Sequence, residues 1–79
     1  MKEVFNMAKK MVITNNIRKL RFFADEMTQL ELAEKAGVSR QMIVSLEAGR
    51  YSPSLETAFK IADIFGVPIG EVFEHEAPK

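Results

Sequence analysis

The stretch 28–50, TQLELAEKAGVSRQMIVSLEAGR, decides the fold of this 79-residue chain. It predicts two short helices joined by a sharp turn. Thr28 and Glu31 have the spacing of a capping box, in which each side chain accepts a hydrogen bond from the other residue's backbone N–H. The first helix is predicted over residues 29–36. We expect it to end at Gly37, because glycine readily takes the left-handed conformation of a helix C-terminal cap.

A second helix follows this turn directly. Ser39 can cap it, residues 40–48 should form it, and Gly49 is its natural end. Small or apolar residues stand where the two helices must meet the core and each other. These inward positions are Ala33, Gly37, Ile43 and Leu46. Two helix caps, a glycine at the turn and a pair of apolar residues that face the same side are together typical of a helix-turn-helix. In that motif the second helix enters the major groove of DNA.

The outer surface of the second helix is predicted to read DNA bases. Arginine and glutamine side chains form two-pronged hydrogen bonds with guanine and adenine edges, and a valine can contact a thymine methyl group. An ordinary helical hairpin that only packs is the alternative. It explains the inward positions, but it does not explain the polar opening of the second helix. The residues expected to contact base edges are Ser39, Arg40, Gln41, Val44 and Ser45.

With these residues in view, the chain resembles the Cro/C1-type helix-turn-helix regulators, also called the xenobiotic-response-element family. The resemblance covers residues 15–73. The matching runs are Thr28-Gln29, Glu31-Leu32-Ala33-Glu34-Lys35, Gly37-Val38-Ser39-Arg40-Gln41, Leu46-Glu47, Gly49-Arg50-Tyr51, Pro53-Ser54-Leu55, Lys60-Ile61-Ala62 and Phe65-Gly66-Val67. The resemblance implies an all-α, five-helix, lambda-repressor-like DNA-binding domain in residues 11–77. Some compact members of the family also join their termini in a small two-stranded sheet, here residues 11–14 with 73–77.

The resemblance also implies an inner ion pair. In the family, an arginine of the first helix commonly pairs with a glutamate at the end of the recognition helix, and here these would be Arg21 and Glu47. The segment 22–27, which follows this arginine, is one residue longer than is common. Many members carry an asparagine where this chain has Ala48, so a side-chain contact at that position is absent.

A second group of residues is expected on the DNA phosphates. Gln29 opens a helix, where backbone N–H groups and the positive end of the helix dipole favour an anion. Arg50 and Tyr51 follow by resemblance, because loops of this family lie on the DNA backbone. The alternatives are a solvated Gln29 and an ordinary helix-surface pair between Lys35 and Glu31. The phosphate candidates are Gln29, Arg18, Lys35, Arg50 and Tyr51.

Composition limits the remaining possibilities. The chain carries 11 basic and 11 acidic residues, but residues 1–50 have a balance of +3 and residues 51–79 a balance of −3. One face can therefore be positive on a neutral protein. There is no cysteine, so disulfides and cysteine-based zinc sites are excluded. No run is long and apolar enough to cross a membrane, and no signal peptide is apparent. We expect a cytoplasmic protein without a cofactor.

Outside the central pair, three further helices are expected. The first runs from a cap at Asn15 or Asn16 to Ala24, a later one covers 55–65, and a short last one covers 69–73. Residues 1–10 are predicted to be a flexible tail. The inward residues are Ile17, Leu20 and either Phe23 or Ala24 in the first of these helices, and Leu55, Ala58, Phe59, Ile61, Ala62 and Phe65 in the next. An exposed apolar patch for dimerisation is expected at Ile64, Val67, Ile69 and Val72.

These observations favour a sequence-specific DNA-binding transcriptional regulator. It should act as a homodimer, joined through its C-terminal region, on an inverted repeat of double-stranded DNA, and repression is expected more than activation. The alternative is a protein-interaction module, such as an antitoxin or a bridging subunit. An enzyme is disfavoured, because the single histidine, His75, has no partner that would make a catalytic or metal site. We expect neither a bound metal nor a small-molecule substrate.

Overall fold

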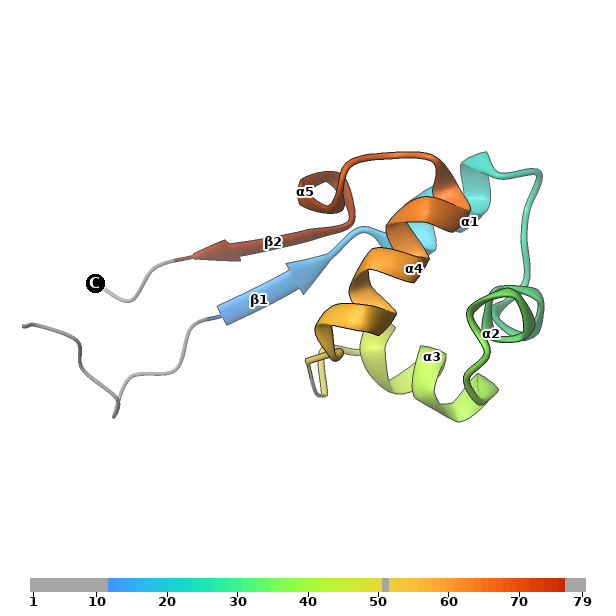
Figure 1. Ribbon diagram of the computed structural model, residues 1–79, viewed down its shortest axis with the longest axis horizontal. Coiled ribbons are helices and arrows are strands. Elements are labelled where there is room, and N and C mark those ends of the chain that lie inside the picture. Colours follow the sequence, from blue (N-terminus) through green and yellow to red (C-terminus); the bar gives the residue numbers. More distant parts are fainter. Residues whose placement is uncertain (1–11, 51, 77–79) are drawn as a thin grey trace, which may run out of the picture.

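A computed structural model describes residues 12–50 and 52–76 of the chain. Along these residues the elements are β1 (Val12–Asn15), α1 (Ile17–Phe23), α2 (Gln29–Ala36), α3 (Arg40–Glu47), α4 (Leu55–Phe65), α5 (Ile69–Val72) and β2 (Phe73–Glu76) (Figure 1). The predicted five-helix fold with a small sheet is confirmed. The predicted tail at residues 1–10, and also Met11, Tyr51 and Ala77, lie outside the described residues.

The capping signals act as the sequence predicts. The Thr28 hydroxyl accepts the Glu31 N–H at 3.0 Å, and the Glu31 carboxylate accepts the Thr28 N–H at 2.8 Å, which completes the capping box of α2. Gly37 ends α2 with φ +72°, a conformation that other residues adopt only at a cost. Ser39 then accepts the Met42 N–H at 3.1 Å. These local bonds bend the chain sharply between α2 and α3.

Helix α3 ends at Glu47, one residue before the predicted end. The chain then turns through Gly49, whose φ is +73°. The Gly49 N–H donates to the Leu46 carbonyl, and the Arg50 N–H donates to the Ser45 carbonyl, both at 3.0 Å. This is the Schellman arrangement that satisfies the last carbonyls of a helix.

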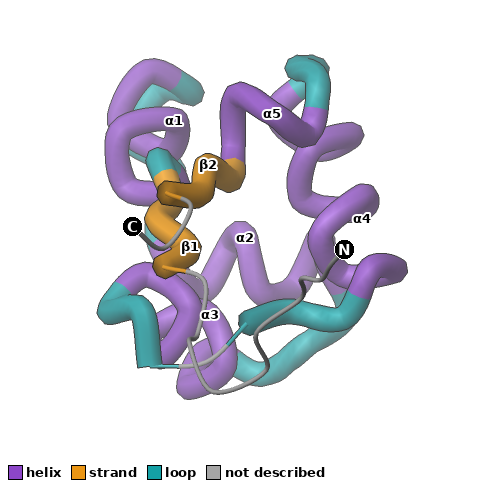
Figure 2. The backbone as a smooth tube through the Cα atoms, turned by 90° about the vertical axis from the view of Figure 1, so that its left-hand side faces the viewer, coloured by secondary structure: helices purple, strands orange, loops and turns teal. Residues whose placement is uncertain are grey.

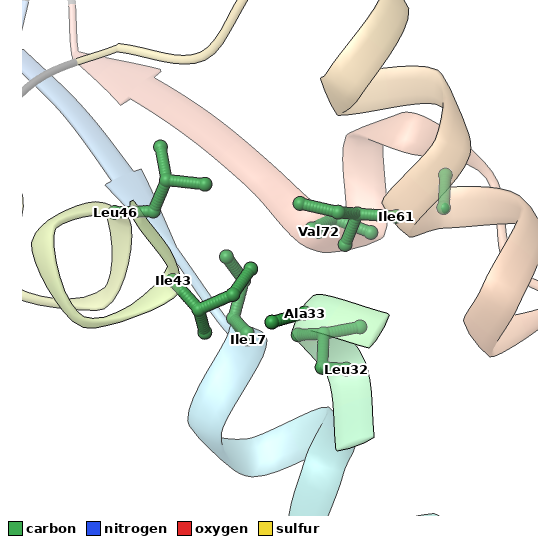
Figure 3. Packing of buried hydrophobic residues seen from close by; sticks show 8 residues of the cluster. Ile17, Leu32, Ala33, Ile43, Leu46, Ile61 and Val72 are labelled. Carbon is green, nitrogen blue, oxygen red and sulfur yellow. The ribbon is translucent and has the colours of Figure 1, made fainter. Parts of the chain in front are cut away.

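One hydrophobic core holds all five helices (Figure 3). Each helix of the described chain contributes at least one fully or nearly fully buried side chain. The core residues are Ile17 of α1, Leu32 and Ala33 of α2, Ile43 and Leu46 of α3, Ile61 and Ala62 of α4, and Val72 of α5. Because α5 has only four residues, its burial of Val72 is what holds it against the other helices.

The two strands extend from the helical part of the molecule and lie side by side (Figures 1 and 2). They pair antiparallel, with Ile13 opposite His75 and Asn15 opposite Phe73. Asn15 also donates through its side-chain amide to the Leu46 carbonyl at 2.8 Å, and its side-chain oxygen accepts the Ile17 N–H at 3.1 Å. The end of the sheet is thereby tied to both α1 and α3.

Three apolar residues that were expected in the core are exposed. Phe23, one of two candidates in α1, is 71% exposed, whereas Ala24 is half-buried. Ala24 lies seven residues after Ile17, almost two full turns, and therefore on the same side of the helix. In α4, Leu55 and Phe59 are 75% and 53% exposed, because that helix faces the core with its neighbouring stripe of Ala58, Ile61 and Ala62.

The apolar patch expected near the C-terminus is absorbed by the core. Val72 is fully buried, and Ile64, Val67 and Ile69 are partly buried and pack against the core cluster. The reason is that α5 folds back against α4, so the turn at 66–68 covers side chains that a separate α4 would expose. These four residues are therefore not free to form the expected dimer surface.

The connection from α1 to α2 contains two left-handed residues that are not glycine. Asp25 has φ +60° and Glu26 has φ +55°. The Met27 N–H donates to the Arg21 carbonyl at 2.9 Å, and the Met27 carbonyl accepts from the Arg21 side chain at 2.8 Å. The extra residue of the segment 22–27 is therefore taken up in a tight turn, and Arg21 remains directed at the inside.

This turn predicts a reversal of the usual preference between alanine and glycine. At Glu26, substitution by glycine should leave the protein about 1 kcal/mol more stable than substitution by alanine, because φ is positive there. At Glu34, inside α2, the alanine variant should instead be more stable than the glycine variant, by about 1 kcal/mol. Urea denaturation followed by circular dichroism measures both pairs. Equal stability of Glu26→Gly and Glu26→Ala would contradict the strained turn.

Candidate nucleic-acid interface

Helix α3 separates its core-facing and outward-facing side chains. Successive residues of an α-helix are rotated by about 100°, so positions 40, 41, 44 and 45 share about 140° of its circumference. Ile43 and Leu46, which are 0% and 2% exposed, point to the opposite side. Arg40 and Gln41 are exposed, and Val44 and Ser45 are half-buried. Four of the five predicted base-contacting residues thus lie on one face of α3, the helix at the lower edge of the molecule in Figure 1.

Ser39, the fifth of these residues, lies at the start of the same helix. It is exposed, and its hydroxyl oxygen caps α3 by accepting the Met42 N–H. A serine hydroxyl that accepts one bond still has a proton to donate. Ser39 can therefore hold the first turn of α3 in place and donate to a base or a phosphate at the same time.

The ion pair implied by the resemblance is present. Arg21 Nε lies 2.6 Å from Glu47 Oε2, and Arg21 Nη2 lies 3.0 Å from Glu47 Oε1. The two side chains are only 14% and 10% exposed. Parallel bonds of this kind are strong and geometrically specific. The pair joins the end of α1 to the end of α3.

Gln29 joins the same network. Its side-chain nitrogen Nε2 donates to Glu47 Oε1 at 3.2 Å, so this carboxylate oxygen accepts from both Arg21 and Gln29. Gln29 is the first residue of α2 and is half-buried. The alternative of a merely solvated Gln29 does not hold, because its amide has a defined partner inside the protein. The network connects three helices through one carboxylate.

A groove of about 600 Å³ runs over this network. Arg18 of α1, Gln29 of α2 and Arg40 of α3 line it, together with Arg21 and Glu47. Three residues predicted to contact DNA are thus brought together from three helices, although they are far apart in sequence. Two carboxylate residues, Glu26 and Glu47, line the groove as well, so the groups in it that are suited to hold an anionic backbone are those of Arg18, Gln29 and Arg40.

Other phosphate candidates lie apart from the groove. Lys35 is exposed in the last turn of α2, and Arg50 is exposed after α3. Within residues 12–50 and 52–76 a helix-surface ion pair forms between Glu56 and Lys60, at 3.5 Å, but none forms between Glu31 and Lys35. Lys35 is therefore not held by the partner that the sequence suggested. Tyr51 lies outside the described residues.

Two features of this surface were missed by sequence reasoning. The bond between Gln29 and Glu47 spans 18 residues, and nothing in either residue's local context indicates it. Phe22 and Phe23 are both exposed, and their rings meet edge to face with centroids 5.3 Å apart. The sequence offers Phe23 as a core candidate, but Phe22 and Phe23 follow Ile17 by five and six residues and therefore lie away from the buried side of α1.

No helix in the part of the chain that the structure describes is long and apolar enough to span a bilayer.

Comparison with known proteins agrees with this geometry. A family model described as helix-turn-helix matches residues 17–72. An uncharacterised HTH-type transcriptional regulator of Methanocaldococcus jannaschii is 50% identical over 60 residues, which cover 73% of this chain and 91% of that protein. The phage transcriptional repressor RstR of Vibrio cholerae is 39% identical over 61 residues, which cover 77% of this chain and 54% of the repressor.

Two further proteins extend the comparison. The immunity repressor of Bacillus phage phi105 is 38% identical over 51 residues, 65% of this chain but only 35% of that repressor. A crystal structure of a Bacteroides fragilis protein, described provisionally as DNA-binding, superposes with a TM-score of 0.68. It shares 24% sequence identity and covers 78% of this chain and 98% of its own. This likeness shows that the fold is shared.

Because the ion pair is buried, removing one partner should destabilise the protein much more than removing both. Arg21→Met leaves Glu47 as an unpaired, nearly buried charge and should lower the free energy of unfolding by about 3–5 kcal/mol. The double variant with Arg21→Met and Glu47→Leu should recover most of this loss, because no isolated charge remains. Urea denaturation measures both. Equal destabilisation of the two variants would show that the ion pair does not control stability here.

Proposed function

The chain belongs to the Cro/C1-type helix-turn-helix family of transcriptional regulators, and on that premise we propose that it is a repressor that binds an inverted-repeat operator as a homodimer. The observation that carries the proposal is that the side chains of α3 are divided between a buried side and an exposed side. Its inner side is fixed in the core by Ile43 and Leu46, while its outer side presents Arg40 and Gln41 to solvent. A helix held in this way can enter the major groove without rearrangement.

The proposed contacts divide into base-reading and positioning groups. The opening turn of α3 carries base recognition, with Arg40 suited to guanine and Gln41 to adenine, while Val44 and Ser45 lie one turn further along the same face. Gln29, Arg18, Lys35, Arg50 and Tyr51 are proposed to contact phosphates, which set the protein's register on the duplex. The groove beside α3 already gathers Arg18, Gln29 and Arg40.

Repression is proposed because two relatives over this region are named as repressors, from phage phi105 and from a Vibrio cholerae phage. A protein that occupies a promoter needs only affinity and specificity to block transcription. Such a regulator works in the compartment that holds the DNA, which agrees with the expected cytoplasmic location.

A homodimer is proposed because one recognition helix covers few base pairs. Two copies related by a twofold axis would place their α3 helices in successive major grooves, about 34 Å apart. The patch first expected for this contact lies in the core. In the C-terminal half of the described chain, the large exposed apolar residues are Leu55 and Phe59, four residues apart on α4. We propose that these two side chains form part of the contact between copies.

Substitutions should separate base reading from backbone binding. Arg40→Ala should reduce discrimination between the operator and mutated sites by about 1–3 kcal/mol, because a guanine contact is lost. Arg50→Ala should weaken all DNA alike and lower the slope of log K against log salt by about 1. Fluorescence anisotropy with operator and scrambled duplexes measures both effects.

Lys60→Ala is the matched control, because Lys60 is an exposed cation on α4 that pairs with Glu56. It should change neither discrimination nor the salt slope. A wild-type protein that binds no DNA at low salt would contradict the regulator proposal and favour a protein-interaction module.

The proposed dimer contact has its own test. Leu55→Glu or Phe59→Glu should turn the dimer into a monomer and lower operator affinity, because a charge would enter an apolar contact. Leu30→Glu is the control for association alone, since Leu30 is also exposed but lies on α2, beside the groove proposed to hold DNA. Sedimentation equilibrium measures the association. A wild-type protein that stays monomeric at all concentrations, free and on the operator, would contradict the dimer.

A further inference from the structure

We propose that Glu47 is a positioning residue for DNA binding, which sets the orientation of the Gln29 amide so that its second N–H points to a phosphate. This inference rests on the proposed function and extends it, because Glu47 itself carries a negative charge and would not be expected to assist binding to DNA. The starting observation is the bond from Gln29 Nε2 to Glu47 Oε1, at 3.2 Å.

A carboxylate can only accept hydrogen bonds, whereas a glutamine amide has one accepting end and one donating end. Beside Glu47, the oxygen of the Gln29 amide would be repelled, so its NH₂ group must take the position next to the carboxylate. One of the two N–H groups is then used by Glu47. The other diverges from it by about 120°, as sp² geometry requires, and remains available to a ligand.

Arg21 makes this arrangement possible on a surface that meets an anion. It binds both oxygens of Glu47, at 2.6 Å and 3.0 Å, and its positive charge compensates the carboxylate. Its third nitrogen, Nη1, donates to the Met27 carbonyl at 2.8 Å, immediately before the cap of α2. The same arginine therefore fixes both the carboxylate that orients Gln29 and the backbone from which α2 begins.

The orientation of the Gln29 amide matters for DNA binding because of where Gln29 lies. Gln29 is the first residue of α2, and it lines the groove with Arg18 and Arg40. A free side-chain rotamer at this site would have to be ordered when DNA binds, at a cost in conformational entropy. With Glu47 as partner, the amide is ordered before binding. The network thus links the stability of the helix pair to the strength of a backbone contact.

A double-mutant cycle in operator affinity tests the proposal. Gln29→Ala removes a hydrogen bond to a charged group and should weaken binding by about tenfold in the wild-type background. In a Glu47→Gln background the same substitution should cost less than about threefold, because a glutamine at 47 can present either end of its amide and no longer selects one orientation. The change of charge at 47 acts on every phosphate and cancels in the cycle.

The control cycle uses Gln41→Ala, at an outward position of α3 for which no bond to Glu47 is present in the described chain. Its cost should be the same in both backgrounds. A structural role of Glu47 alone would lower the cost of both substitutions, and that result would overturn the proposal. An equal cost of Gln29→Ala in the two backgrounds would overturn it as well.

A second readout locates the contact on the DNA. Single neutral methylphosphonate groups, placed in turn along one half-site, should reveal one phosphate whose neutralisation no longer weakens binding in Gln29→Ala. Glu47→Gln should lose sensitivity at that same phosphate and keep it elsewhere. Circular dichroism sets a temperature at which every variant is folded. Glu47→Asp, which withdraws the carboxylate by one methylene, replaces Glu47→Gln if the latter is unfolded.

If wild-type protein binds no operator, the proposed function itself fails. That result differs from a cycle in which the two substitutions are not coupled.

Discussion

The structure depends on one constraint above others: α3 must bury Ile43 and Leu46 and leave the opposite side of the same eight residues uncovered. The small side chain of Ala33 allows α2 to approach closely, and the left-handed Gly37 turns the chain between the two helices. The remaining helices complete the core around this pair. Among the described residues ten apolar side chains are buried, which is a modest core, so the caps and the ion pair contribute a relevant share of the stability.

The polar network adds a second function to this packing. Glu47 lies at the last position of α3, where it accepts bonds from α1 through Arg21 and from α2 through Gln29. A buried ion pair is not by itself a source of net stability, since both charges lose their hydration. It does fix geometry. Here it fixes the side chains at the N-terminus of α2 and in the groove beside the recognition helix. A DNA backbone is proposed to lie at these two places.

Much of this arrangement could be predicted from the sequence, because its causes are local. A hydroxyl before a helix, a glycine after it and apolar residues at helical spacing each act over a few residues, and they located α2, α3 and α4 within one residue of their ends. The family resemblance added the ion pair and the sheet. The expected base-contacting residues lie on one face of α3 or at its start, although their contacts with DNA stay a prediction.

The parts that sequence reasoning missed depend on long-range packing. Whether Phe23, Leu55 or Phe59 is covered depends on which side of its helix packs against the other helices, and in both α1 and α4 a neighbouring side does so. The opposite error at Val72 has the same origin, because α5 folds back and buries a residue that looked free. The bond between Gln29 and Glu47 requires the relative positions of two helices, which no local pattern contains.

We propose that the outer side of α3 reads specific bases as one of two symmetric copies. The most direct measurement is selection of bound sites from a random pool of double-stranded DNA by the full chain. Selection should enrich a palindromic sequence whose half-sites are centred about one helical turn, roughly 10 base pairs, apart. Recovery of unenriched random sequences, or of no DNA at all, would contradict it.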